Sequence, residues 1–207
     1  MTTEMPYTPE DPINYWGHRY EIGSTGWNLG HAHPLADKGV EVVGVDIALQ
    51  ALKKFASASG QDWTETEAPK LGPDAKLLTR KDGKIKLYWG DALNFSQDVE
   101  GKFDAIFDCD GLHVLDEKRR LRFGEMVKGL LNPGGRLLLE AIAYDKSILT
   151  DENFKPSMAV PPPYSISVED VKSMFEPECS VEILDKHSNK LLYGYDSDFY
   201  AYKVVKL

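Results

Sequence analysis

The stretch Val40-Glu41-Val42-Val43-Gly44-Val45-Asp46-Ile47 decides the fold of this chain. Its apolar run is too continuous for a strand with one face in water, so it predicts a parallel strand that is buried on both faces. Asp46 stands where that strand would emerge at its carboxyl end, which is where open α/β sheets bind ligands. A carboxylate there can accept hydrogen bonds from both hydroxyls of a ribose. The competing interpretation is a helix N-cap, a role that aspartate often fills.

Composition and charge exclude several function classes. The 207 residues include 42% hydrophobic and 28% charged side chains, which is typical of one globular domain with its own core. The net charge of −9 argues against a nucleic-acid groove or an anionic membrane surface as partner. The sequence shows neither an apolar run long enough to span a membrane nor a signal-peptide pattern, so we expect a cytoplasmic protein.

The cysteines and two of the histidines give no sign of a metal site. Cys109 and Cys179 stand far apart and form no metal-spaced pair, so reduced thiols are expected. His31 and His33 have a spacing that suits neither a helical metal pair nor a zinc finger. We therefore expect no bound metal.

The rest of the chain alternates strand and helix patterns, which predicts an α/β fold with a mainly parallel sheet. Residues 1–12 are expected to form a flexible polar arm and residues 13–207 a single domain. A helix is predicted over Ala48–Ser59, and an Asp82-Gly83 turn predicts a hairpin over Lys76–Tyr88. Further elements are predicted at Phe103–Asp108 (strand), around Phe123, Met126, Val127 and Leu130 (helix), at Arg136–Ile142 (strand), after a capping box at Ser167–Asp170 (helix), and at Val181–Leu184 and Phe199–Val205 (antiparallel strands).

Several motifs occur in an order that resembles the class I S-adenosylmethionine-dependent methyltransferases, and more narrowly the thiopurine S-methyltransferase family. They are Trp16-x3-Tyr20-x2-Gly23-x-Thr25-x-Trp27, Leu35–Gly39 continuing to Asp46, the Asp82-Gly83 hairpin, Phe103–Asp108, Leu131–Leu139 and Pro162-Pro163-Tyr164. The resemblance implies a Rossmann-like sheet with helices on both faces, S-adenosyl-L-methionine as cofactor, and a monomer. It also implies a small aromatic or heterocyclic thiol as methyl acceptor. Such a reaction needs alignment more than a catalytic dyad, so no catalytic residue is assigned.

The resemblance also implies a set of site residues. Those expected to bind the cofactor are Trp16, Tyr20, Trp27, Asp46, Asp91, Ala92, Asp108 and Cys109, and those expected to bind substrate are Trp27 and Tyr164. Each has a structural alternative. The aromatic side chains could form the core contact of an N-terminal helix, Asp91 could be a turn residue, and Asp108 could simply be solvated in a loop.

Two positions depart from the family pattern. The family's first strand and its glycine-bearing loop should lie between Pro34 and Leu35, and they are missing. Cys109 stands where many relatives carry an arginine. With the central strand deleted, we expect the Val40–Val45 strand to remain parallel to the Phe103–Phe107 strand in one sheet. The two strands must then pair directly or leave a seam of unpaired amides, and unpaired buried amides are costly.

Three functions compete on this basis. The motif order favours a small-molecule S-methyltransferase. The missing strand favours a non-catalytic or impaired member of the same fold that binds cofactor weakly or not at all. A dinucleotide-dependent dehydrogenase ranks last, because no Gly-x-Gly-x-x-Gly precedes the acidic strand.

Overall fold

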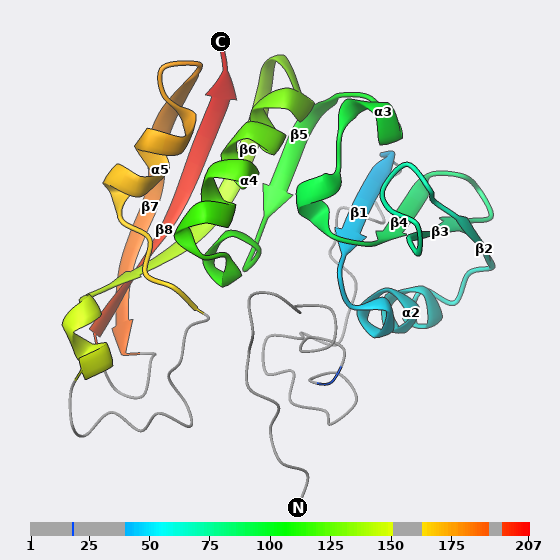
Figure 1. The fold of residues 1–207 in the computed structure, drawn as a ribbon, viewed down its shortest axis with the longest axis horizontal. Coiled ribbons are helices and arrows are strands. Elements are labelled where there is room, and N and C mark those ends of the chain that lie inside the picture. The colour runs from blue at the N-terminus through cyan, green and yellow to red at the C-terminus, as the bar shows by residue number, and fades with distance from the viewer. Residues whose placement is uncertain (1–17, 19–39, 151–162, 191–195) are drawn as a thin grey trace, which may run out of the picture. The chain divides into compact units, whose positions relative to one another are not determined.

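The computed structural model describes residue 18 and residues 40–150, 163–190 and 196–207 (Figure 1). The chain divides into two compact units between Phe95 and Ser96. Each unit has its own four-stranded sheet.

The sheet of the first unit has the strand order β1-β4-β3-β2. Its strands are β1 (Val42–Asp46), β2 (Trp63–Glu67), β3 (Lys76–Arg80) and β4 (Ile85–Trp89), and its helices are α2 (Leu49–Ala58) and the short 3-10 turn η2 (Ala92–Asn94). Only β1 and β4 run parallel, and β4, β3 and β2 form an antiparallel meander. A small core of Leu52, Ala56, Leu78, Ile85 and Leu87 lies between α2 and the sheet.

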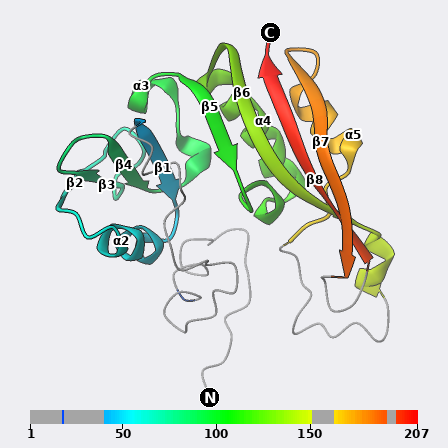
Figure 2. The ribbon, with the colours of Figure 1, turned by 180° about the vertical axis from the view of Figure 1, so that it is seen from behind.

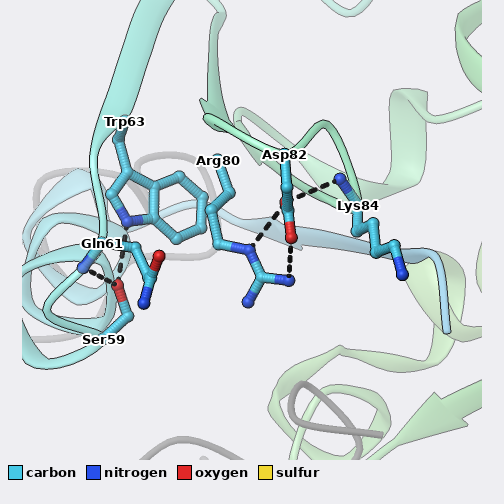
Figure 3. A network of polar contacts seen from close by, with 6 residues as sticks. All are labelled: Ser59, Gln61, Trp63, Arg80, Asp82 and Lys84. Atoms are coloured by element: carbon cyan, nitrogen blue, oxygen red, sulfur yellow. Dashed lines mark hydrogen bonds and ion pairs between the residues drawn. The ribbon is translucent and has the colours of Figure 1, made fainter. Parts of the chain in front are cut away.

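Polar contacts fix both ends of this meander (Figure 3). Gly83 takes a φ of +73°, and its N–H donates to the Arg80 carbonyl at 2.7 Å, which closes the β3–β4 turn. Asp82 accepts two hydrogen bonds from the Arg80 guanidinium, at 2.9 and 2.8 Å, and one from the Lys84 N–H at 3.0 Å. At the other end, Trp63 Nε1 donates to Ser59 Oγ at 3.0 Å, which ties β2 to the end of α2.

The sheet of the second unit has the order β5-β6-β8-β7. Its strands are β5 (Phe103–Asp108), β6 (Leu131–Tyr144), β7 (Cys179–Lys190) and β8 (Asp196–Lys206). Its helices are α3 (Gln97–Glu100), α4 (Glu117–Leu130) and α5 (Val168–Phe175), with 3-10 turns η3 (Leu112–Val114) and η4 (Lys146–Thr150). β5 runs parallel to β6, whereas β6, β8 and β7 are antiparallel.

One face of this second sheet carries the unit's core. α4 and α5 lie in front of the sheet in Figure 1 and behind it in Figure 2, so both cover the same face. Leu137 and Leu139 of β6 are buried, whereas Leu138 between them is 40% exposed. Phe107 pairs with Leu138 and is 41% exposed on the same side. The alternation follows from the period of two in a strand.

The prediction that the Val40–Val45 and Phe103–Phe107 strands lie side by side in one sheet is wrong. β1 and β5 do not pair, because each is an edge strand of a separate sheet. The expected burial on both faces is also absent: all residues of β1 are half-buried, and β5 has no buried residue. An edge strand has a neighbour on one side only, so its side chains pack against fewer partners.

The local predictions are confirmed in position and type. The helix after Asp46, the hairpin, the parallel Phe103–Asp108 strand and the closing antiparallel strands are all present. Ser167 and Asp170 form the capping box of α5, with each side chain bonded to the backbone of the other residue. β2 was not predicted, since its Thr and Glu residues lack an apolar alternation.

Removing the hydroxyl group of Tyr202 should stabilise the fold. Tyr202 is buried in the second sheet, and its hydroxyl has no hydrogen-bond partner among the described residues. Tyr202→Phe should therefore raise the free energy of unfolding by about 1 kcal/mol in urea titrations. Tyr144→Phe is the matched control, because the Tyr144 hydroxyl donates to the Pro163 carbonyl at 2.8 Å, and this change should cost about 1 kcal/mol. Equal effects of the two changes would contradict this reasoning.

Candidate functional site

The parallel strands of the first unit bring two of the predicted carboxylates to the same end of their sheet, where both strands terminate. Asp46 is the last residue of β1 and lies opposite Trp89, the last residue of β4. The Gly90 N–H donates to the Asp46 carbonyl at 3.1 Å, so the ladder continues to the end of both strands. Asp91 follows directly after Gly90. The structure therefore brings Asp46 together with the segment that carries Asp91 and Ala92.

The carboxylate of Asp46 begins the turn into α2. Its Oδ1 accepts a hydrogen bond from the Ala48 N–H at 2.7 Å, and Ala48 is the N-cap residue of the helix. Burial raises the pKa of Asp46, and hydrogen bonds from the backbone of Ala48 and Ile47 oppose that rise. The helix N-cap alternative for Asp46 is wrong, because Ala48 is the N-cap of α2 and Asp46 forms the turn that precedes it. This turn fixes the orientation of the carboxylate at the carboxyl end of the strand.

Asp91 and Ala92 form the corresponding turn after β4. The side chain of Asp91 accepts a hydrogen bond from the Leu93 N–H at 2.9 Å and caps η2, whose first residue is Ala92. Next to them, Trp89 Nε1 donates to the Ile47 carbonyl at 2.9 Å, which links the ends of β1 and β4 through side-chain contact.

In the second unit, Asp108 ends β5 and organises the loop that follows. Its Oδ2 accepts a hydrogen bond from the Leu112 N–H at 2.9 Å. A Cβ atom on Gly111 would lie 2.2 Å from Asp108 Oδ1, so this tight approach requires a glycine. Burial raises the pKa of Asp108 to about 6, an effect that the Leu112 hydrogen bond only partly offsets. Asp108 therefore titrates far above an ordinary aspartate.

Cys109 contacts a carboxylate that the sequence gave no reason to place there. Its Sγ donates to Glu140 Oε2 of β6 at 3.3 Å. Burial, followed by the nearby charge of Asp110 and the contact with Glu140, raises the pKa of Cys109 to about 12. The thiol is consequently protonated at neutral pH, and a nucleophilic role for it is unsupported.

The next two polar residues of the same loop pair with each other. Asp110 has a φ of +69°, a backbone conformation that residues other than glycine rarely adopt. Its Oδ1 lies 3.1 Å from His113 Nε2. The hydrogen bond from His113 lowers the pKa of Asp110. Asp110 is thus a negative charge beside Asp108 at neutral pH.

Tyr164, the predicted substrate residue, is anchored to this loop. Its N–H donates to the His113 carbonyl at 2.7 Å. The next residue, Ser165, accepts from the Tyr144 N–H and donates to the Tyr144 carbonyl, at 2.9 and 2.8 Å. The Ser165 hydroxyl is therefore bonded to the backbone of the last residue of β6. Tyr164 lies beside the loop that carries Asp108 and Cys109.

The structure places five of the predicted site residues at strand ends or in the turns after them, and Tyr164 next to one of these turns. Trp16, Tyr20 and Trp27 lie outside the described residues. Sequence reasoning did not identify Glu140, His113 and Arg120 as residues of this region. Arg120 had a detectable signal, because it is spaced three and seven residues from the buried Phe123 and Val127 on α4.

Two further properties bear on function. Within residues 40–150, 163–190 and 196–207, no group of His, Cys, Asp and Glu side chains has a metal-binding arrangement. Among the described helices, none is long and apolar enough to cross a membrane.

The raised pKa of Asp108 predicts how the stability depends on pH. In the folded protein Asp108 keeps its proton up to its raised pKa of about 6, whereas the ordinary pKa of an aspartate is 3.8, so ionising Asp108 in the folded state opposes folding. The free energy of unfolding should therefore fall as the pH rises from about 4 to 7. Asp108→Asn removes this titration. Relative to the parent, D108N should gain about 1–3 kcal/mol between pH 4 and 7. A difference that stays flat over this range in urea titrations would refute the assignment.

Solved structures show that the fold is that of class I methyltransferases. Magnesium protoporphyrin IX methyltransferase (ChlM) from Synechocystis PCC 6803, solved with bound SAH, superposes over 99% of this chain and 90% of its own, with a TM-score of 0.55 and 15% identity. A SAM-dependent methyltransferase from Methanosarcina mazei covers 84% of this chain and 85% of its own, with a TM-score of 0.56 and 20% identity. The predicted α/β class I methyltransferase fold is confirmed by these likenesses. The expected mainly parallel sheet is wrong for the described residues, where four of the six strand pairings are antiparallel.

Curated relatives are similar at the level of sequence. A probable thiopurine S-methyltransferase of Danio rerio is 29% identical over 150 residues, which cover 72% of this chain and 60% of the relative. The thiopurine S-methyltransferase of Bos taurus is 28% identical over 151 residues, or 73% of this chain and 57% of the relative. The match thus spans about 60% of the length of these relatives. The family model described as Thiopurine S-methyltransferase (TPMT) matches residues 23–192. With most of its length matched by that model, the chain belongs to the thiopurine S-methyltransferase family.

Proposed function

We propose that this protein is an S-adenosylmethionine-dependent methyltransferase that methylates the sulfur of a small aromatic or heterocyclic thiol. The observation that carries the proposal is the pairing of Asp46 with Trp89, which brings Asp46 and Asp91 to the same edge of the first sheet. Family membership and the fold support the reaction class. The thiol acceptor is supported by the family's name and by the cytosolic, metal-free character expected from the sequence.

The first unit fits the nucleoside part of the cofactor. Asp46 holds a carboxylate at the end of β1, where it can accept hydrogen bonds from ribose hydroxyls. The hydrogen bond from the Ala48 N–H occupies one lone pair of Oδ1. The carboxylate can still accept hydrogen bonds from a ligand, because it has about four lone-pair sites. Asp91 and the backbone of Ala92 lie at the end of the adjacent strand and can contact an adenine edge.

The acidic residues of the second unit, taken by themselves, suit a positively charged group. Asp108 and Glu140 lie on the paired strands β5 and β6, and Asp110 follows two residues after Asp108. Negative groups at this edge favour a sulfonium cation electrostatically. A bound cation would also lower the raised pKa of Asp108 toward its ordinary value, so the aspartate would ionise on binding.

The bound cofactor supplies an electrophilic methyl group, and the protein's own residues need only orient and desolvate the reactants. The acceptor sulfur forms the new S–CH3 bond while the sulfonium C–S bond breaks, and the acceptor's proton passes to solvent. Tyr164, whose N–H donates to the His113 carbonyl, would form a wall for an aromatic acceptor. The Cys109 thiol, protonated beside Glu140, does not compete as a nucleophile.

Changing Asp46 should weaken cofactor binding more than changing Asp91. A carboxylate that accepts two ribose hydroxyls makes two charge-assisted hydrogen bonds, each contributing roughly 1.5–3 kcal/mol. Asp46→Ala should therefore raise the Kd for S-adenosylhomocysteine at least tenfold in calorimetric titrations, and Asp91→Ala should raise it less. Asp46→Asn is the folding control, since an amide oxygen can still accept from the Ala48 N–H. If D46A and D91A both bind as the parent does, the ribose assignment is wrong.

The deletion between Pro34 and Leu35 predicts weak retention of the methionine end. The glycine-bearing loop that the resemblance implies is missing there, so Asp46 and Asp91 would contribute mainly to binding the nucleoside. The parent should bind adenosine about as tightly as S-adenosylmethionine and should methylate thiols slowly. Inserting a strand-plus-loop segment at that position should raise cofactor affinity and Tm together. Micromolar binding of S-adenosylmethionine, far tighter than that of adenosine, would show that other residues hold the methionine end.

A further inference from the structure

Arg120 of α4 is a buried cation with no carboxylate partner among the residues that the structure describes. The residue is 7% exposed, yet its guanidinium forms no ion pair with any of the described residues. Nε donates to the Leu115 carbonyl at 2.9 Å and Nη1 donates to the Ser165 carbonyl at 3.3 Å. Carbonyl groups satisfy the N–H donors but do not neutralise the charge, and burying an unneutralised charge is unfavourable.

The guanidinium faces an aromatic ring. Arg120 Cζ lies 5.4 Å from the centroid of the Tyr164 ring, which is within the range of a cation–π contact. Tyr164 cannot easily move away, because its own N–H is bonded to His113 and the flanking Pro163 and Ser165 are both bonded to Tyr144. The short segment Pro163–Ile166 thus presents the ring at a fixed distance from a fixed charge.

The surrounding acidic groups do not cancel this charge. Asp170 and Glu117 act on Arg120 at longer range and stabilise its charged form, but burial is the larger effect and lowers the pKa of Arg120. Asp170 already accepts the Ser167 N–H in the capping box at 2.8 Å. A guanidinium stays protonated in proteins, so Arg120 keeps a full positive charge beside the Tyr164 ring.

We infer that Arg120 determines acceptor specificity: its charge, acting across the Tyr164 ring, favours an aromatic acceptor bound as an anion, such as an aryl thiolate, over a neutral acceptor of the same shape. The inference rests on the proposed function, because it takes Tyr164 to be the wall of the acceptor site. Arg120 does not touch the acceptor and is a positioning residue. An anion stacked on the far face of the ring would lie roughly 9 Å from the guanidinium, where Coulomb's law at an effective dielectric constant of about 20 gives a preference on the order of tenfold.

The same charge would act differently on the acceptor and on its methylated product. The acceptor thiol gives its proton to solvent on binding as a thiolate, its sulfur forms the bond to the methyl carbon, and the sulfonium C–S bond breaks. The acceptor changes from an anion to a neutral thioether in this step. Arg120 therefore stabilises the bound acceptor but not the methylated product, which favours product release.

The test uses two unreactive ligands of equal shape and different charge, benzoate and benzamide, with the full chain in calorimetric titrations. The parent should bind benzoate about tenfold more tightly than benzamide. Arg120→Gln keeps hydrogen-bond donors but loses the charge, so it should bind the two ligands with equal affinity. Arg120→Lys keeps the charge and should retain most of the preference for benzoate. It is the control that shows whether a substitution at this position can be made without loss of the fold.

Tyr144→Phe is the control for a purely structural role. It removes the 2.8 Å bond to Pro163 and loosens the same segment without changing any charge. Y144F should weaken benzoate and benzamide to the same extent, leaving their ratio unchanged. The inference is overturned if R120Q keeps the benzoate preference, if R120Q behaves like Y144F, or if the parent binds neither ligand. Titration with S-adenosylhomocysteine separately tests the proposed function, since that ligand depends on Asp46 and should be unaffected by R120Q.

Discussion

The pairing of parallel strands controls where the candidate site residues lie. Neighbouring parallel strands end at the same edge of a sheet, so residues far apart in the sequence become neighbours there. β1 and β4 bring Asp46 to the turn that begins at Gly90, and β5 and β6 bring Asp108 and Cys109 beside Leu139 and Glu140. Without these two pairings, the acidic side chains would be scattered turn residues. The antiparallel strands of both sheets contribute buried core residues and do not alter which residues meet where the parallel strands end.

Each acidic side chain at these edges also serves the backbone. Asp46, Asp91 and Asp108 each accept a backbone N–H from a residue two to four positions later in the chain. These bonds satisfy amide groups that a turn would otherwise leave unpaired, and they hold each carboxylate in one orientation. The structural role and the proposed binding role would therefore coincide at these positions, because a preorganised carboxylate loses little entropy when a ligand binds.

Local sequence signals predicted the elements of this fold better than their partners. Asp82-Gly83 specified a turn and Ser167-x-x-Asp170 a helix start, because both depend on residues adjacent in sequence. The apolar run before Asp46 indicated a parallel strand but carried no information on which strand lies beside it. The contact of Cys109 with Glu140 was equally invisible, since it joins two strands and depends on their register. Arg120 lies in a run of basic residues, where composition suggests a solvated surface and only its helical spacing indicates burial.

Within the second unit, acidic residues lie in and beside the loop after β5, and a buried cation contacts the ring of Tyr164, which is bonded to that loop. Asp108 ends β5, Asp110 follows it, and Glu140 of β6 contacts Cys109. Arg120 lies 5.4 Å from the centroid of the Tyr164 ring, and the Tyr164 backbone is bonded to the same loop at His113. A sulfonium is attracted to the acidic residues and a thiolate to Arg120. In the proposed reaction, this separation would orient the two reactants by charge, with the cation and the anion each bound where the other is disfavoured. The methyl group would then pass between them as both charges disappear, and neither product would keep the electrostatic attraction that held its precursor.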